Sequence, residues 1–306
     1  MVRDNPIVTV IGGAGFLGSY VVRRLAKLGF RIQVVSRNAS LKAQKFNVAG
    51  AVGQIALIDC DATNYKKLEK CIEKSDYVVN LIGTLYSKGK QNFESLHHAL
   101  PQKIAELCSK HKVKKFVHVS AILHESAGES QYAKSKLAGE KAVLKIYPKA
   151  VILRPSVLFG AEDNFINMFN NMSKISLFMP LIGGGNTKFQ PVYVDDVAAS
   201  ISACLQDKEG ATNGKIFELG GPKVYSMRGI MELILKITRR KRILLSIPFP
   251  IAKTIACFTG LLPKPPLTLD QVILLKYDNV LTNQDGLKEL GIKPKYLESI
   301  APTYLS

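Results

Sequence analysis

Apolar, β-branched runs alternate with helical periodicity along the first half of the chain. Six short apolar runs predict β-strands, at 7–11, 31–36, 54–58, 77–82, 115–120 and 150–156. Between them, FLGSYVVRRLAKLG and LHHALPQKIAELCSKHK repeat apolar residues at the spacing of an amphipathic helix. Strict alternation of strand and helix predicts right-handed crossovers and a parallel sheet with helices on both faces. The predicted fold class is therefore α/β, with a doubly wound, Rossmann-type sheet.

The pattern loosens after residue 160, where glycine and proline interrupt longer spacings. We therefore predict a Rossmann domain at 1–158 and a smaller mixed α/β domain at 159–306. Parts of 187–222 are expected to complete the Rossmann domain, because IFELGG at 216–221 has the composition of a further strand of the main sheet.

Length and composition fit a globular chain. Its 306 residues, 47% of them hydrophobic, can form one large core or a core with a small appended domain. The five cysteines form no CxxC pair and have no regular spacing, which favours buried thiols in a reducing compartment over disulfides or a zinc site. No metal site is predicted. Because no charged-then-apolar leader precedes the first predicted strand, we expect a cytoplasmic location, or a mature form in an equivalent compartment.

The chain is strongly basic. Its 42 Lys and Arg residues against 24 Asp and Glu residues give a net charge of +18. Such an excess favours an anionic partner, which could be a nucleic acid, a membrane surface or an acidic protein. A lysine-rich proteome would give the same excess without any function, and both explanations stay open here.

The first predicted strand ends in the glycine-rich sequence IGGAGFLG. Gly12 permits a tight turn, Gly15 lets the backbone approach a pyrophosphate, and Gly18 permits close packing of helix on strand. The following helix presents free N–H groups and the positive end of its dipole to the phosphates. The residues predicted to contact a dinucleotide here are Gly12, Gly13, Ala14, Gly15, Phe16, Leu17 and Gly18.

The end of the second predicted strand bears on the choice of cofactor. An NAD enzyme usually has Asp or Glu here, whereas this chain has Ser36, Arg37 and Asn38. Because a guanidinium suits a 2′-phosphate, we predict NADP(H) in preference to NAD(H), although Arg37 could also be a solvated strand end. Asp61 and Ala62 follow the third strand, where they are expected near the adenine, and Asp61 could equally cap the next helix.

A proton relay is predicted at the start of the helix after the fifth strand. Tyr132 and Lys136, in YAKSK, stand four positions apart and would share one helix face. A tyrosine phenol has an ordinary pKa of about 10, and a neighbouring ammonium and an oxidised nicotinamide would both lower it. This spacing arises by chance on many helices. The prediction of a relay therefore rests on the position of the pair, at the start of the helix after the fifth predicted strand.

The segments GGAGFLG, DATN, NLIG at 80–83, YAKSK and RPS resemble those of the extended short-chain dehydrogenase/reductase superfamily. The resemblance covers nearly all of the chain. It implies further cofactor contacts at Leu81, Ile82, Gly83, Val119, Pro155 and Ser156.

The superfamily also has a Ser or Thr that hydrogen-bonds the reacting carbonyl, and here the match departs. That position falls at Ala121, with Ser120 one residue early. A shift of one residue turns a strand side chain to the opposite face. Losing such a donor can lower the rate by about 10²–10³. The relay is therefore predicted to be incomplete, with Ser120 as a substitute if the turn is irregular.

Three segments of the second half, ILRPSVLFGAEDNFINMFNN, KFQPVYVDDVAASI and PPLTLDQVILLKYDNV, narrow the resemblance. Together they look like the branch formed by the Rossmann-type accessory subunit of respiratory complex I and its bacterial relatives. That branch implies a tightly held NADPH that is not turned over, and a peripheral position on the membrane arm. It also implies a link to quinone metabolism in some relatives.

The segment 236–262 combines a basic cluster, RRKR, with an apolar stretch. Residues 243–262 are long enough to span a membrane, but Pro248, Pro250 and Lys253 interrupt them, so a span is rejected. The stretch could rest on an anionic membrane surface or pack inside the second domain, and the sequence favours neither.

The leading hypothesis is an NADPH-binding accessory or assembly protein that associates with complex I subunits and holds its cofactor structurally. A location on the cytoplasmic face of the inner membrane follows from it. The second hypothesis is an active NADP-dependent reductase or epimerase, acting on a quinone precursor, a lipid or a sugar nucleotide. The third is a nucleotide-ratio sensor or nucleic-acid binder, and of the anionic partners nucleic acid is the least favoured. The small-molecule substrate is left open.

Overall fold

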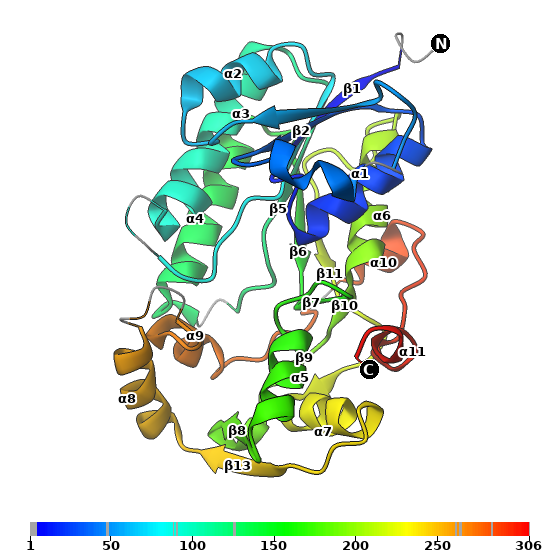
Figure 1. Cartoon of the computed structure of the whole chain (residues 1–306). Helices are drawn as coiled ribbons and strands as arrows, with labels where there is room; N and C mark the ends of the chain where they lie inside the picture. Colours follow the sequence, from blue (N-terminus) through cyan, green and yellow to red (C-terminus); the bar gives the residue numbers. More distant parts are fainter. Residues whose placement is uncertain are drawn as a thin grey trace.

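A computed structural model describes residues 5–46, 49–87, 89, 91–124, 127–260, 262, 265–282 and 284–305. Within these residues, seven parallel strands form the main sheet, seen nearly edge-on in Figure 1. In order across the sheet they are β11 (Ile216–Leu219), β6 (Val151–Pro155), β5 (Lys115–Val119), β4 (Tyr77–Asn80), β1 (Ile7–Ile11), β2 (Arg31–Ser36) and β3 (Ile55–Asp59).

The strands form where β-branched runs can be buried on both faces. Each of the six runs predicted in the first half is a strand, with ends that shift by at most a few residues. All five residues of β5 are buried, as expected for an inner parallel strand under helices on both sides. The strand predicted within 216–221 is also confirmed, because β11 pairs with β6 at the edge of the sheet.

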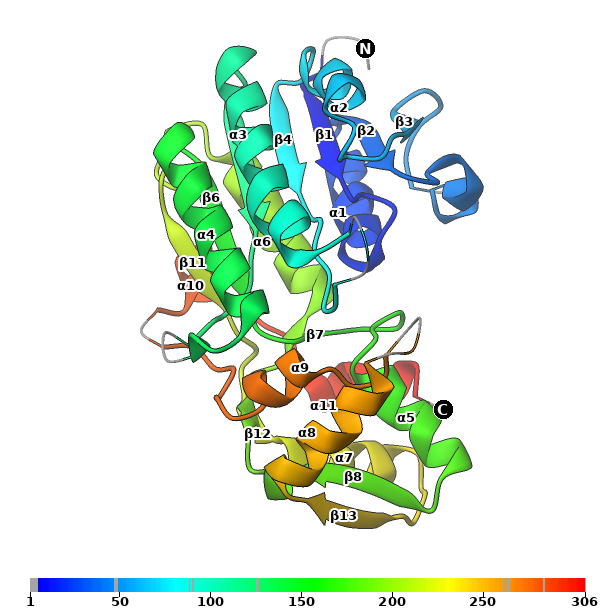
Figure 2. The same ribbon diagram turned by 90° about the vertical axis from the view of Figure 1, so that its left-hand side faces the viewer.

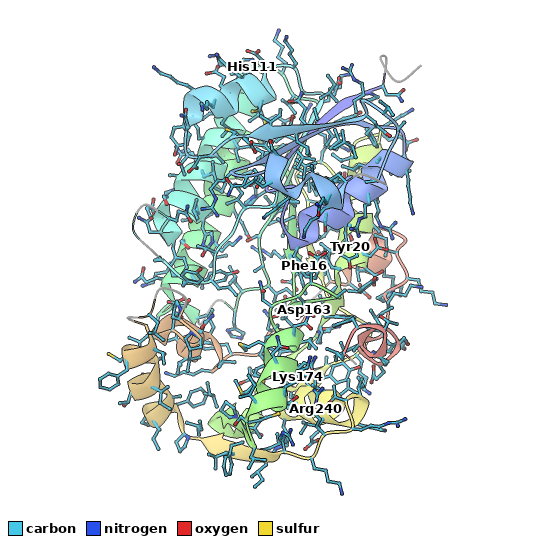
Figure 3. The ribbon with its side chains drawn as sticks, in the orientation of Figure 1. Phe16, Tyr20, His111, Asp163, Lys174 and Arg240 are labelled. Carbon is cyan, nitrogen blue, oxygen red and sulfur yellow. The ribbon has the colours of Figure 1, made fainter. Side chains whose placement is uncertain are left out.

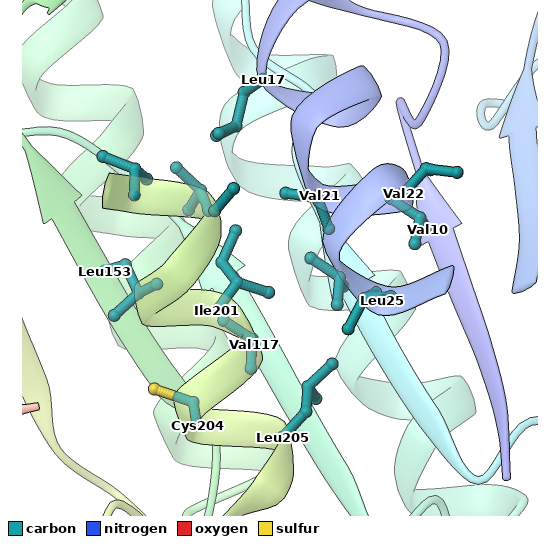
Figure 4. Close-up of a cluster of buried hydrophobic side chains, with 14 of the residues drawn as sticks. Val10, Leu17, Val21, Val22, Leu25, Val117, Leu153, Ile201, Cys204 and Leu205 are labelled. Atoms are coloured by element: carbon teal, nitrogen blue, oxygen red, sulfur yellow. The ribbon is translucent and has the colours of Figure 1, made fainter. Parts of the chain in front are cut away.

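Two layers of helices cover the sheet, as the alternating pattern predicted. Helices α1 (Phe16–Lys27) and α6 (Val194–Gln206) bury one face, where Val21, Leu25 and Ile201 pack together (Figure 4). The other face is covered by α2 (Tyr65–Ile72), α3 (Leu100–Lys110) and α4 (Gln131–Ile146). Figure 2 shows α3 and α4 in front of the sheet and α6 behind it.

A smaller region lies beyond the carboxyl ends of the strands, in the lower part of Figure 1. Its core contains Phe169, Met179, Ile230 and Ile234, the last two on one face of a helix as the sequence pattern indicates. The elements of this region are α5 (Ile166–Ile175), β8 (Phe178–Ile182), α7 (Met227–Ile237), β13 (Ile243–Ile247), α8 (Phe249–Thr259), α9 (Leu269–Leu274) and α11 (Leu297–Ile300).

Short elements tie the two regions together. The strands β7 (Leu158–Phe159) and β10 (Val192–Tyr193) pair with each other, as do β9 (Lys188–Phe189) and β12 (Tyr225–Ser226). Helix α10 (Gly286–Glu289) returns to the main sheet, where the side chain of its Leu287 joins the large core.

The apolar segment 243–262 folds as strand β13 followed by helix α8. No helix in the described part of the chain has the length and apolar composition needed to cross a membrane. Helix α8 buries Ala252 and Ala256 but exposes Ile251, Ile255 and Phe258. The interior-packing alternative therefore holds for the alanines, while the large apolar side chains point outward.

Candidate functional site

The predicted cofactor contacts lie together along one edge of the main sheet. They follow the carboxyl ends of six strands, from the turn after β1 to the residues that end β6. Ligands of open parallel sheets bind at this edge, where loops and helix N-termini converge. The edge faces the smaller region, whose Asn279 donates a hydrogen bond to the carbonyl of Ile122, just after β5.

The loop between β1 and α1 has the features of a pyrophosphate site. Gly12 has a φ of +84°, which favours glycine, and Gly15 is exposed at the start of the helix. A Cβ at Gly18 would collide with the backbone of Gly13, so helix and loop approach as closely as glycine allows. No side chain caps α1 and no acidic residue occupies its first turn. The N-terminus of α1 therefore fits an anionic group.

The side of the site where the adenosine is predicted lies beyond β2 and β3. Arg37 and Asn38 are exposed there, and the positive charge of Arg37 acts on Asp61. The pKa of Asp61 is lowered, first by the N–H of Thr63 that donates to its carboxylate and also by Arg37. The helix that follows is capped by Asn64, which accepts from the N–H of Lys67, so the alternative that Asp61 caps it was wrong.

Lys42 is a basic residue of the predicted cofactor site that the sequence analysis missed. Its Nζ lies 3.5 Å from the carbonyl oxygen of Ala14, in the phosphate loop. The short 3₁₀ segment that carries it begins at Ser40, whose N–H and hydroxyl both donate to Asp59 at the end of β3. No spacing rule marks Lys42, because its position depends on this contact between two separate loops.

Tyr132 and Lys136 lie in the first turns of α4, as predicted. The Nζ of Lys136 lies 3.4 Å from the carbonyl oxygen of Val119, and a Cβ on Gly83 would be 3.4 Å from the same Nζ. Lys136 is only 4% exposed, and burial lowers its pKa to about 8. The lysine therefore reaches both strand ends where the nicotinamide half of a dinucleotide is predicted.

The tyrosine does not have the lowered pKa that an adjacent ammonium alone would give. Burial raises the pKa of Tyr132 to about 12, and the negative charge of Asp270 acts in the same direction. In the protein without cofactor, desolvation therefore favours the neutral phenol over the phenolate.

The hydroxyl expected beside this tyrosine is absent from the groove. Ala121 occupies the aligned position, and Ser120 is 5% exposed with an Oγ that is buried and lacks a hydrogen-bond partner. Beyond the end of β5 at Val119, the N–H of Ser120 donates to Leu153 and that of Ile122 donates to Pro155. Because its Oγ is buried, the hydroxyl of Ser120 is not exposed at the edge of the sheet.

The residues at the end of β6 are held by the C-terminal region. The hydroxyl of Ser156 donates to the side-chain oxygen of Asn279 at 2.7 Å, and Asn279 also accepts from the N–H of Val157. Pro155 and Ser156 lie at the predicted edge and are buried. The sequence analysis missed Asn279, which stands 123 positions after Ser156.

His97 lies at the centre of the buried layer behind the relay. Its Nε2 accepts from the N–H of Thr84 at 3.0 Å, and its Nδ1 is 3.0 Å from Ser135 Oγ on α4. Its ring meets that of Tyr132 edge to face. Burial lowers the pKa of His97 to about 3, so the ring is neutral. The residue joins the turn after β4 to the helix that carries Tyr132.

His118, in β5, is a core histidine with one unsatisfied ring nitrogen. It is buried, and its Nδ1 lies 3.1 Å from Asn80 Nδ2, but its Nε2 has no hydrogen-bond partner. Together with Ser120, it leaves two polar atoms unpaired beneath the edge of the sheet.

The comparison with protein families agrees with this geometry. A family model described as the NAD dependent epimerase/dehydratase family matches residues 8–220, which include the phosphate loop and the tyrosine–lysine pair. The chain belongs to this family. Members of this epimerase/dehydratase family bind a nucleotide cofactor, so the predicted class of cofactor is supported, while the choice between NADP(H) and NAD(H) is not decided by the family.

Two relatives in the epimerase/dehydratase family are similar over most of their length. One is NADH dehydrogenase [ubiquinone] 1 alpha subcomplex subunit 9, mitochondrial, of Arabidopsis thaliana, which is 34% identical over 98% of this chain and 77% of that protein. The other is the NADH-ubiquinone oxidoreductase 40 kDa subunit, mitochondrial, of Neurospora crassa, which is 32% identical over 97% of this chain and 78% of that protein.

A solved structure of the epimerase/dehydratase type supports the fold. The UDP-glucose 4-epimerase of Thermotoga maritima superposes with a TM-score of 0.74 at 18% sequence identity, covering 98% of this chain and 97% of that one. The architecture, with a seven-stranded parallel sheet and a smaller C-terminal region, is therefore that of extended short-chain dehydrogenases. At this identity the likeness concerns the fold alone.

Proposed function

We propose that the protein is an NADP(H)-binding accessory or assembly protein of respiratory complex I in which the nucleotide has a mainly structural role. The residues that would hold it are the amides at the start of α1, the exposed Arg37, and Lys42 beside the phosphate loop. When bound, NADPH would bring a transferable hydride to this groove.

Two basic side chains support the preference for NADP(H). Arg37 stands where an NAD enzyme usually has a carboxylate, and Lys42, in the segment that follows, has its Nζ 3.5 Å from the carbonyl oxygen of Ala14 in the phosphate loop. A guanidinium and an ammonium together suit the two negative charges of a phosphate monoester. Asp61 is the acidic residue on this side of the groove that interacts with Arg37, and its carboxylate also accepts from Thr63.

One observation carries the structural role of the nucleotide. The position that would hold the carbonyl-binding hydroxyl is Ala121, and the nearest hydroxyl, that of Ser120, is buried in the interior. A phenol with a raised pKa adds to this, because Tyr132 then gives up its proton reluctantly. The site therefore binds a nucleotide well and supports turnover poorly.

The relatives support the proposed association with complex I. The plant and fungal relatives are named as subunits of NADH dehydrogenase or NADH-ubiquinone oxidoreductase, and nearly all of this chain aligns with them. A surface of the smaller region also suits a position beside a membrane. It exposes Ile251, Ile255 and Phe258 of α8, next to β13 with its exposed Ile243 and Leu245.

The alternative is an active NADP-dependent reductase or epimerase. The observation in its favour is the intact pair of Tyr132 and Lys136, with the lysine buried against the ends of β4 and β5. In that case Tyr132 would donate its proton to the substrate oxygen as the hydride is transferred. The substrate class would be a quinone precursor, a lipid or a sugar nucleotide.

Complementation of a strain that lacks the protein separates the two functions. Native protein and Tyr132→Phe are each expressed, and the amount of assembled complex I is measured on native gels. A structural role predicts that Tyr132→Phe restores assembly as well as the native chain does. An assembly defect in this variant, despite normal protein level, would contradict the structural role and support turnover.

The nucleotide is identified in the same preparations. Denaturation of the purified protein should release NADPH from native and Tyr132→Phe alike. Arg37→Ala should weaken NADPH binding by about tenfold or more and leave NADH binding nearly unchanged, because one charge-assisted contact is lost. Arg31→Ala, at the opposite end of β2, is the matched control. Equal affinity of native protein for NADH and NADPH would contradict the proposed preference.

A further inference from the structure

A carboxylate from the smaller region accepts hydrogen bonds from the start of α4. Asp270 accepts from the N–H of Gln131 at 2.7 Å, from the N–H of Tyr132 at 3.1 Å and from the hydroxyl of Ser130 at 2.8 Å. Ser130 is fully buried and itself caps the helix by accepting from Ala133. Two of the backbone donors at the start of this helix are thus satisfied from a segment about 140 positions away.

Electrostatics and hydrogen bonding hold the Asp270 carboxylate in place. A carboxylate at the N-terminus of a 16-residue helix interacts favourably with the positive end of the helix dipole. Both oxygens of Asp270 are used, so the carboxylate is held in one orientation. Its negative charge also lies close enough to Tyr132 to help raise the pKa of that phenol.

Neighbouring contacts connect the same two segments. The ring of Tyr277 stacks on that of His124, with centroids 5.5 Å apart. The Nζ of Lys276 is 3.9 Å from the carboxylate of Glu129. These contacts hold the loop before α4 to the segment after α9. Asp270, in α9 itself, adds the contact with the turn that carries Tyr132.

The helix that carries Asp270 rests on α8. Val272 of α9 is fully buried against Ala252 and Ala256 of α8, and α8 exposes its large apolar side chains on another part of its surface. A cavity of about 250 Å³ lies beside this junction and is lined by Phe93, Cys257 and Asp270, among others. Phe93 in turn contacts the ring of Tyr132 edge to face. A continuous set of contacts thus runs from the surface of α8 to the relay.

We propose that Asp270 is a positioning residue, through which the smaller region holds the opening turn of α4 and so places Tyr132 at the edge of the sheet. A displacement of α8 and α9 then changes the position of Tyr132, even when the Rossmann core is unchanged. The inference concerns the free protein and does not depend on which nucleotide binds.

Amide hydrogen exchange on the full chain tests the proposal. In Asp270→Ala, the amides of Gln131 and Tyr132 should exchange about tenfold faster or more, because each loses a charged acceptor. Amides in β1 and β5 should be unaffected. Asp270→Asn keeps one acceptor oxygen at this turn, so a smaller effect than that of Asp270→Ala is expected. Asp285→Ala, which removes the carboxylate that caps α10, is the matched control.

A double-mutant cycle tests the connection with α8. Val272→Ala loosens the packing of α9 and should speed exchange at Gln131 and Tyr132, whereas it should add little in the Asp270→Ala background. Ile234→Val, in the other core of the smaller region, should leave these amides unchanged. If the effects of Val272→Ala and Asp270→Ala are additive, the proposed route through Asp270 is wrong.

Ionisation of Tyr132 provides a readout that general destabilisation would not move. Isotope-labelled tyrosine, assigned with Tyr132→Phe, should begin to titrate at lower pH in Asp270→Asn than in the native protein, because a negative charge has been removed. Unchanged exchange together with an unchanged titration would overturn the proposal. Faster exchange throughout the chain would also overturn it, since Asp270 would then contribute only to overall stability.

Discussion

At the scale of single residues, His97 makes stability depend on pH. Burial lowers its pKa to about 3, with a smaller contribution from the charge of Lys136. In the unfolded chain a histidine has a pKa of about 6.5, so between these values unfolding takes up a proton. The stabilisation is therefore fully present above the unfolded pKa and is lost as the pH falls toward the folded one.

His97→Gln should reveal this dependence. At about pH 7 the variant is expected to be less stable than the native protein by about 1–3 kcal/mol, since buried hydrogen bonds are lost. At about pH 5 the difference should narrow by up to about 2 kcal/mol, because the glutamine cannot take up a proton. Urea denaturation at both pH values measures it. His98→Gln is the control, because His98 pairs with Glu94 at the surface. If the stability difference between His97→Gln and the native protein is the same at both pH values, the low pKa of His97 is contradicted.

At the scale of elements, the turn between β1 and α1 requires glycine at two positions for different reasons. A Cβ at Gly15 would meet only the carbonyl oxygen of Gly12, at 3.2 Å, and would project where the pyrophosphate is predicted. A Cβ at Gly18 would strike the backbone of Gly13. One glycine therefore leaves room for the ligand, and the other allows the helix to approach the strand.

Alanine variants should separate these roles. Gly15→Ala is expected to fold with nearly native stability and to lose nucleotide affinity by about tenfold or more. Gly18→Ala should lose about 1–3 kcal/mol of stability through overpacking and should bind nucleotide weakly as well. Thermal unfolding and fluorescence titration with NADPH measure the two effects. Gly229→Ala, where a Cβ would meet only Ser226 Oγ at 3.4 Å, is the control. Equal stability of Gly15→Ala and Gly18→Ala would contradict the distinction.

The elements were predictable from the sequence to the extent that their causes are local. The β-branched strands, the glycine-rich turn and the helix that carries Tyr132 and Lys136 depend on neighbouring residues, and each lies where the sequence predicts it. Lys42, Asp270 and Asn279 were missed, because each acts on a segment that only tertiary folding brings near. The raised pKa of Tyr132 in the protein without cofactor was likewise not foreseen, since burial is a property of the folded molecule.

At the scale of the whole molecule, charge and exposed apolar surface coincide in the smaller region. Of the basic cluster, Arg240 donates to Asn170 and Arg242 to the carbonyl of Ser173, so both complement the last turns of α5. Arg239 and Lys241 are exposed. Figure 3 shows Arg240 and Lys174 together at the end of the molecule remote from His111. Half of this cluster is thus engaged in structure, and the other half is available to an anionic surface.

An outward-facing apolar helix in the region that also exposes these cations should favour vesicles that contain anionic lipid. Each basic residue near such a surface contributes about 1 kcal/mol, and burial of a phenylalanine contributes about 1.5–3 kcal/mol. Phe258 is 72% exposed on α8, so Phe258→Asp should weaken co-sedimentation with anionic vesicles by about tenfold or more at unchanged stability. Val52→Asp changes an even more exposed apolar residue outside the smaller region and should have little effect. Binding of native protein should fall as salt is added. If Phe258→Asp binds as the native chain does, α8 is a contact for protein or solvent and the membrane role is excluded.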